Sequence, residues 1–269
     1  MAESSRGFGV AAGLDPEIAT PLAARCDELG YGSIWSNDTP MASGLETLAA
    51  FAEGSERLDL GVAVIALDRR EPNEIADKIE ELGLPRERLW LGVGAGFSKK
   101  PLTGMRETLP ILREALGDIR LVLAAMGPKM CQFAGAEFDG VFFNWMTPEF
   151  AADARKHVEK GAADASRETP PVMGYVRTAI GDDARPRLAK EEGFYRKLHD
   201  GYKNHFDRLD EEVGTVGVAE PDSPAAQRQL SEFEALDVTV VRGLASANLE
   251  AMSTLAELAG PQEVAVEPE

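Results

Sequence analysis

The run IRLVLAAMGPKMCQFAGAEFDGVFFN, residues 119–144, contains a complete strand–helix–strand unit. Its apolar residues Ile119–Ala125 predict a buried strand, Lys129–Gly135 a helix that begins after a proline, and Val141–Asn144 the next strand. Strands as uniformly apolar as these are typical of a parallel sheet covered by helices on both faces. The unit therefore predicts an α/β fold.

The same alternation extends outward to both ends of the chain. The predicted strands are Phe8–Ala12, Ser33–Asn37, Leu58–Leu67, Arg88–Val93, Ile119–Ala125, Val141–Asn144, Val172–Ile180 and Val238–Arg242. The predicted helices are Asp15–Leu29, Gly44–Glu53, Pro72–Leu82, Thr103–Leu116, Lys129–Gly135, Pro148–Lys160, Asp182–Leu198 and Asn248–Leu258. Eight strand–helix units in one domain favour closure of the sheet, so we predict a (β/α)8 TIM barrel.

One connection is much longer than the others. Asp200–Leu236 separates the seventh and eighth units and ends in a helical run, Ala225–Leu236, so we interpret it as a helical insertion. Residues 1–260 are then one barrel domain. Residues 261–269 are acidic and contain proline, and we expect a flexible tail there.

The charge of the chain argues against several classes of partner. With 28 Lys and Arg against 46 Asp and Glu, the formal net charge is -18, which repels nucleic-acid backbones and anionic membranes. Residues 1–6 are polar and resemble no signal peptide, and no apolar run is long enough to span a membrane. We expect a cytoplasmic protein in which Cys26 and Cys131 are reduced core thiols.

Several kinds of catalytic site are disfavoured by the motifs. His157, His199 and His205 have neither HxH nor HExxH spacing, so we predict no metal site. There is no GxSxG elbow and no cysteine with a nearby histidine, which disfavours hydrolysis through a nucleophile. Hydride transfer fits better, because it needs a cofactor and the exclusion of water more than it needs protein acids.

Three strand ends are candidates for ligand contacts. GVGAG, residues 92–96, lacks the GxGxxG spacing, and its glycines either turn the chain or lie against a planar ring. At residues 126–129 (MGPK), helix amides and Lys129 could hold a phosphate, the alternative being a proline-started helix with a surface lysine. Arg242 ends the strand where many barrels bind phosphate, but an ion-paired or surface arginine fits it as well.

Four segments give the chain a resemblance to a known family. They are SIWSND (Ser33–Asp38), LGVAVIALDRREPNEIA (Leu60–Ala76), LWLGVGAG (Leu89–Gly96) and AAMGPKMCQFAGAEFDGVFFNWMTPE (Ala124–Glu149). In this order and spacing the chain resembles the luciferase-like monooxygenase superfamily, in particular its actinobacterial and archaeal branch that uses the deazaflavin coenzyme F420. The similarity covers most of residues 6–183, and the last segment is the most specific. The family fold is also a barrel.

The resemblance implies a set of cofactor contacts. Asp38 matches the position that hydrogen-bonds the cofactor ring, and Ala63-Val64 matches a strand bulge that contains a non-proline cis peptide in relatives and backs the ring. The remaining positions that match contacts to the ring, its side chain or its phosphate are Gly94, Ala95, Gly96, Met126 and Gly127, with Lys129 and Asn144 nearby.

Two positions depart from the pattern of the sugar dehydrogenases in that branch. Thr39 stands where those enzymes have a histidine, and Phe97 stands where they have a carboxylate. Both departures argue against sugar-phosphate oxidation by a general base.

The resemblance implies hydride transfer between F420 and a small organic substrate. An FMN-dependent monooxygenase and a non-catalytic cofactor-binding protein are the alternatives, the second because acid and base residues are missing. Relatives commonly pair through barrel helices, so a homodimer is expected. Trp35, Phe97, Trp145 and Tyr175 either line the pocket or belong to the core.

Overall fold

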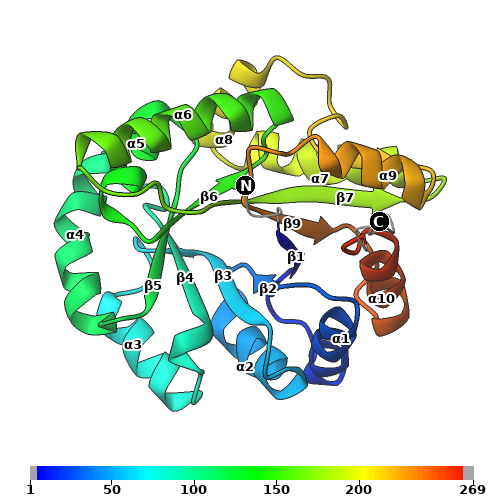
Figure 1. Ribbon diagram of the computed structural model, residues 1–269, viewed down its shortest axis with the longest axis horizontal. Helices are drawn as coiled ribbons and strands as arrows, with labels where there is room; N and C mark the ends of the chain where they lie inside the picture. Colours follow the sequence, from blue (N-terminus) through cyan, green and yellow to red (C-terminus); the bar gives the residue numbers. More distant parts are fainter. Residues whose placement is uncertain (1–4, 263–269) are drawn as a thin grey trace, which may run out of the picture.

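Eight parallel strands close into a barrel in the computed structural model, which describes residues 5–262 (Figure 1). Closure is visible in the pairing, because β6 bonds to β5 on one side and to β7 on the other. The expected barrel is confirmed, and residues 263–269 of the predicted tail lie outside the described residues. The barrel strands are β1 (Ser5–Val10), β2 (Ser33–Ser36), β3 (Asp59–Ala66), β4 (Leu89–Gly94), β5 (Arg120–Ala124), β6 (Gly140–Asn144), β7 (Val172–Ile180) and β9 (Val238–Gly243).

Helices surround the strands, and each predicted helix is present within a few residues of its expected ends (Figure 1). Asp15 caps the first helix as predicted, since its side chain accepts a hydrogen bond from the amide of Glu17 at 2.9 Å. The helices are α1 (Pro16–Glu28), α2 (Gly44–Gly54), α3 (Pro72–Glu81), α4 (Pro101–Leu116), α5 (Pro128–Glu137), α6 (Pro148–Asp164), α7 (Ala184–Leu198), α8 (Asp200–Leu209), α9 (Ser223–Ser231) and α10 (Leu249–Leu258), with a 3-10 turn at Arg86–Arg88.

The connection between β7 and β9 differs in part from the predicted helical insertion. It contains α8 and α9, but also a short strand, β8 (Val218–Glu220), which pairs with Thr178–Ile180. That edge of β7 is free because β6 pairs only with Val172–Tyr175. Three residues are too few to show a strand period in sequence, so only the exposed edge of β7 explains why this segment becomes a strand.

Side chains fill the lower part of the barrel. Trp35, Phe142, Tyr175 and Val240 are buried together there, with ring centroids 4.9 Å apart for Trp35 and Phe142 and 4.6 Å apart for Phe142 and Tyr175. Gly61 on β3 leaves the space that the Trp35 indole occupies, since a Cβ there would lie 2.0 Å from the ring. Any ligand must therefore bind above this aromatic layer, at the ends of the strands.

Two further expectations concern the helices and cysteines. No helix among residues 5–262 is long and apolar enough to cross a bilayer. Cys26 and Cys131 are free and buried, as predicted. Burial raises the pKa of the Cys131 thiol to about 12, so it is neutral at physiological pH.

Candidate functional site

The carboxyl ends of the barrel strands form one rim, and the predicted site residues belong to five neighbouring strand ends. Asp38 follows β2, Val64 lies near the end of β3, Gly94 ends β4, Gly127 follows β5 and Asn144 ends β6. In barrels of this type the ligand site is built at this rim. The topology thus brings positions that are more than 100 residues apart in the chain to one edge of the barrel.

The bulge on β3 is where the family resemblance places it. The peptide bond between Ala63 and Val64 is cis, and the pairing with β4 shifts register between Val62 and Ile65. The bulge brings its backbone close to β4, where a Cβ at Gly92 would lie 2.3 Å from the Val62 carbonyl oxygen. Glycine at this position is therefore a packing requirement of the bulge.

Small side chains from three strands form a shallow cradle beside the bulge. A Cβ added at Gly94 would lie 3.1 Å from Val64 Cγ2 and 3.5 Å from Ala124 Cβ, so the three residues face one another across a space that a side chain would fill. Val64 and Ala124 are only half-buried although they belong to barrel strands. We call Val64, Gly94 and Ala124 the cradle. Its apolar surface is suited to contact with the face of a planar ring.

The loop after β4 is held in place by the loop after β3. Gly96 has a φ of 57°, and a Cβ there would lie 1.9 Å from Asp68 Oδ1. The other oxygen of Asp68 accepts a hydrogen bond from the Phe97 amide at 2.9 Å. Ala95 packs, half-buried, against the main core. The glycine run is thus a turn fixed by Asp68, and it holds the edge of the cradle rigidly.

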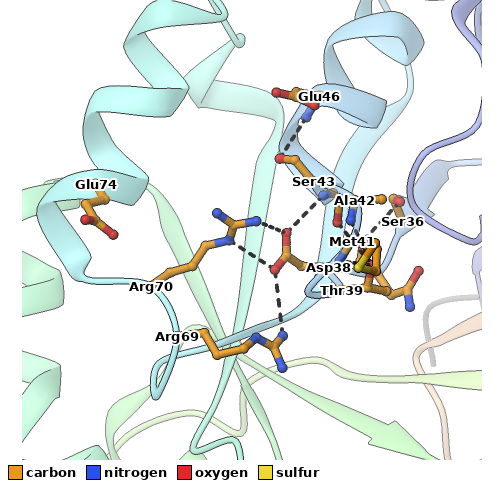
Figure 2. A network of polar contacts seen from close by, with 12 residues as sticks. Ser36, Asp38, Thr39, Met41, Ala42, Ser43, Glu46, Arg69, Arg70 and Glu74 are labelled. Atoms are coloured by element: carbon orange, nitrogen blue, oxygen red, sulfur yellow. Dashed lines mark hydrogen bonds and ion pairs between the residues drawn. The ribbon is translucent and has the colours of Figure 1, made fainter.

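The carboxylate of Asp38 is surrounded by cations (Figure 2). Arg70 Nε and Nη2 donate to its two oxygens at 3.1 Å each, and Arg69 lies 3.9 Å away. The amide of Gly44, at the start of α2, donates to the same carboxylate at 3.1 Å. Asp38 therefore joins the loop after β2 to the loop after β3, and its predicted contact with a cofactor ring stays a prediction.

The start of α5 is open. Gly127 caps the helix in an extended conformation, no side chain caps its first amides, and a Cβ at Gly127 would meet nothing within 4 Å. Met126, one residue earlier, is half-buried against the main core. Lys129 lines a groove of about 810 Å³ between α4, α5 and α6. Its side chain thus lies on the helical layer, while the free amides of Gly127 and Lys129 remain available for an anion.

Asn144 is engaged by two polar side chains that the sequence argument did not assign. Its Oδ1 accepts a hydrogen bond from Arg177, and its Nδ2 donates to the Tyr202 hydroxyl at 2.9 Å. Burial raises the pKa of Tyr202 to about 12. Arg177 had a signal in the sequence, since it is the one charged residue in the strand Val172–Ile180. Tyr202 comes from the insertion and had none.

The four aromatic candidates separate into two environments. Trp35, Trp145 and Tyr175 are buried, whereas Phe97 is 59% exposed. The Phe97 ring packs edge-on against His199, with centroids 5.0 Å apart, where α7 meets α8. The junction of α7 and α8 thus contacts the loop after β4. The first three residues belong to the core and Phe97 lies at the margin of the rim.

No cluster of three or more His, Cys, Asp or Glu residues suited to a metal ion is found within residues 5–262. The polar groups at the rim include Asp38 and Asp68, whose carboxylates accept hydrogen bonds from the protein, and Asn144, Arg177 and Tyr202, which bond to one another.

Comparison with known proteins adds three kinds of likeness. A 5,10-methylenetetrahydromethanopterin reductase of Methanolobus tindarius is 25% identical over 208 residues, covering 63% of this chain and 64% of that protein. The chain thus matches less than two thirds of the length of this curated relative.

Solved structures share the fold at lower identity. The coenzyme F420-dependent tetrahydromethanopterin reductase of Methanopyrus kandleri has a TM-score of 0.72 at 18% identity, covering 95% of this chain and 98% of its own. An F420-dependent secondary alcohol dehydrogenase, solved with an F420-acetone adduct, has a TM-score of 0.70 at 15% identity, covering 96% and 99%. The oxygenating constituent of 3,6-diketocamphane monooxygenase of Pseudomonas putida, solved with FMN, has 0.68 at 14%, covering 96% and 99%.

The family model described as luciferase-like monooxygenase matches residues 6–123 and 107–259. The two segments together include all the strands of the barrel and the rim that they form. The chain belongs to the luciferase-like monooxygenase family of enzymes.

Proposed function

We propose that the chain is an oxidoreductase that passes a hydride between the deazaflavin F420 and a small organic substrate. The cradle of Val64, Gly94 and Ala124 is the observation that carries this proposal, since Val64 and Ala124 are half-buried and Gly94 between them has no side chain to fill the space. The F420 named for two of the structural neighbours supports it.

The residues at the rim have separable tasks in this proposal. The cradle backs the ring, and the open first turn of α5 binds the phosphate through amides and the helix dipole. When bound, a deazaflavin supplies a ring carbon that accepts or donates a hydride. Asp38 keeps the loops after β2 and β3 together beside the ring. The aromatic layer below the rim excludes water from that side.

FMN is the alternative cofactor, because a neighbour with a TM-score of 0.68 was solved with it. Both molecules present a tricyclic ring and a phosphate to the same groups. A direct comparison decides between them: the purified chain is titrated with F420 and with FMN at equal concentrations, and the quenching of cofactor fluorescence is recorded. We expect the quenching of F420 fluorescence to saturate at a lower concentration than the quenching of FMN fluorescence. A chain that binds neither cofactor at micromolar concentration is no oxidoreductase of this kind.

Gly94→Val tests whether the cradle is the site. Its side chain would occupy the space between Val64 and Ala124, so we expect F420 to bind about tenfold more weakly or worse, a loss of about 1.4 kcal/mol. Gly94→Ala adds one methyl group at 3.1 Å from Val64 and should have a smaller effect in the same direction.

Gly193→Val is the matched control, because a Cβ at Gly193 meets nothing within 4 Å and the residue lies on α7. Circular dichroism establishes that each variant is folded. If Gly94→Val is folded and binds F420 as tightly as Gly193→Val, the ring does not lie on the cradle.

Two expectations about the whole chain are part of this proposal. We expect residues 1–260 to unfold as one domain, and we expect the chain to form a homodimer through its barrel helices. A single calorimetric transition and a mass from light scattering of twice 29.0 kDa are the corresponding measurements.

A further inference from the structure

Two arginines lie side by side at the rim, on the side opposite the cradle. Arg177 on β7 and Arg242 on β9 are directly paired in the sheet, and they are 2% and 8% exposed. Each follows by two residues a side chain of the barrel interior, Tyr175 and Val240, so both side chains belong to the interior face. Their guanidinium groups lie 5.5 Å and 6.0 Å from the centroid of the Tyr175 ring.

No carboxylate within residues 5–262 forms an ion pair with either of them. Arg177 donates to Asn144 and stacks over the Trp145 ring at 4.3 Å, and neither partner is charged. Glu191 acts on Arg242 only from beyond ion-pair distance. Burial and the neighbouring Arg177 charge lower the pKa of Arg242. A buried like-charge pair without an anion is unfavourable in the free protein.

Three arginines elsewhere in the chain, in contrast, have carboxylate partners. Arg120, at the opposite end of the barrel, stacks over Trp90 at 4.1 Å but also pairs with Asp59 at 3.0 Å. Arg113 and Arg155 likewise have carboxylate partners at 2.6 Å and 3.0 Å. A chain with 46 acidic residues places none of them against Arg177 or Arg242 within the described part of the chain. Arg6 and Arg88 likewise have no carboxylate partner within residues 5–262, but they donate to backbone carbonyl oxygens. This part of the rim differs in that two buried arginines without a carboxylate partner lie side by side.

The surroundings add hydrogen-bond donors that have no acceptor. Within residues 5–262, Arg177 Nε, Tyr175 Oη and Trp145 Nε1 are fully buried and have no hydrogen-bond partner. The guanidinium nitrogens of Arg242 also form no hydrogen bond with these residues, and the side chain retains a small exposed area at the rim. Donors without acceptors and charges without counter-ions call for the same ligand, an oxyanion that accepts several hydrogen bonds at once.

We propose that Arg177 and Arg242 bind a carboxylate or phosphate group of the organic substrate, so that the substrate is an organic anion. The oxyanion site stands on the side-chain arrangement, whereas its assignment to a substrate rests on the proposed function. Since β7 and β9 lie across the barrel from β3 and β4, the anionic group is held on the side away from the cradle. The reacting part of the substrate can then point toward the cradle.

Binding of inorganic phosphate tests the site without any cofactor. Phosphate is titrated by calorimetry against a chloride reference of equal ionic strength, and the melting temperature is followed in parallel. We expect saturable binding that raises the melting temperature. Arg242→Gln and Arg177→Gln should each weaken it about 10- to 100-fold, the loss that follows from removing a charge-assisted hydrogen bond.

Arg120→Gln is the matched control, because it removes a stacked barrel arginine at the other end. It should leave phosphate binding unchanged and lower the melting temperature, since Asp59 loses its partner. Arg242→Gln, in contrast, removes an unpaired charge and should not lower the melting temperature without phosphate. No saturable phosphate binding, or the same binding in Arg242→Gln, would overturn the proposal.

Fluorescence titration of Arg242→Gln with F420 identifies the source of the oxyanion. Unchanged cofactor binding together with lost phosphate binding supports a substrate group. Weaker cofactor binding would assign the site to the cofactor and overturn the substrate assignment. If wild-type protein binds phosphate here but neither cofactor, the proposed function fails while the oxyanion site stands, so the two failures are distinguishable.

Discussion

Asp38, which the family resemblance matches to a contact with the cofactor ring, has several partners within the protein. Its side chain is 1% exposed and contacts two arginines and a backbone amide (Figure 2). A carboxylate with these partners is fully satisfied by the protein. Asp38 lies at the rim, where Arg69 and Arg70 contact its oxygens, and its contact with a cofactor ring stays a prediction.

Asp38→Asn should destabilise the protein by about 1–2 kcal/mol, because one oxygen becomes an amide that faces the Arg70 donors. Chemical denaturation measures the loss. Asp118→Asn is the control: Asp118 is 92% exposed in its pair with Arg86, and removing its charge should change stability by less than about 0.5 kcal/mol. Equal losses in the two variants would show that Asp38 is no anchor.

At the scale of elements, helix packing depends on glycines at one crossing. A Cβ at Gly161 on α6 would lie 1.9 Å from the Gln132 carbonyl oxygen on α5, and one at Gly135 would lie 2.1 Å from the Val158 carbonyl oxygen. The two helices therefore approach at backbone distance. Since the open turn at Gly127 begins α5, this crossing also positions the candidate phosphate site.

Gly161→Ala should cost about 1–3 kcal/mol, because neither backbone can move without separating α5 from α6. Gly193→Ala is the opposite case, with open space around the new methyl group on α7, and should stabilise by about 0.5–1 kcal/mol. Thermal unfolding of the two variants gives the sign directly. A stable Gly161→Ala protein would mean that the helices are not in close contact.

The insertion is attached to the barrel through buried polar groups. His205 on α8 is fully buried, and its Nε2 lies 2.6 Å from the Trp145 carbonyl oxygen. Glu192 on α7, also fully buried, accepts the Gly214 amide at 2.8 Å and pairs with Arg196 at 2.6 Å. Burial lowers the pKa of His205 below the ordinary histidine value of 6.5, so the folded state favours the neutral ring.

Stability should therefore fall in mild acid. The unfolded chain takes up a proton near pH 6.5 whereas buried His205 does not, so stability is complete above that pH and declines below it, by at most about 1.4 kcal/mol per pH unit for one proton. Denaturation between pH 7.5 and 5.5 measures the slope.

His205→Gln retains a donor for the Trp145 carbonyl but does not titrate, so the slope should be smaller. Part of the pH dependence should remain because of His199, since burial also lowers the pKa of that residue. An unchanged slope in a variant with both histidines replaced by Gln would exclude this cause.

For the whole molecule, the rim has two unlike halves. Small residues on β3, β4 and β5 form an apolar cradle, while β7 and β9 contribute two buried arginines without a counter-ion in the described residues. The α7–α8 junction contacts the loop after β4 through His199 and Phe97. The proposed sites for a flat ring and for an oxyanion therefore lie on opposite sides of the mouth of the barrel.

Much of this architecture can be predicted from the amino-acid sequence. Apolar runs of strand length between amphipathic helices determine the barrel, because every parallel strand must be covered on both faces. The family motifs pointed to Val64 and Gly94, which lie at or near strand ends of the rim, and anticipated the cis peptide at Ala63-Val64. These features depend on residues that are close in the sequence, so a local sequence pattern can predict them.

Other features arise only when distant segments meet. The partners of Asp38 and Asn144, the strand β8 on the free edge of β7, and the absence within residues 5–262 of a carboxylate ion-paired with Arg242 each depend on barrel closure. Sequence determined which elements form and which rim they share. Tertiary structure alone decided which charges are neutralised there, because contact energies depend on separation in space and not along the chain.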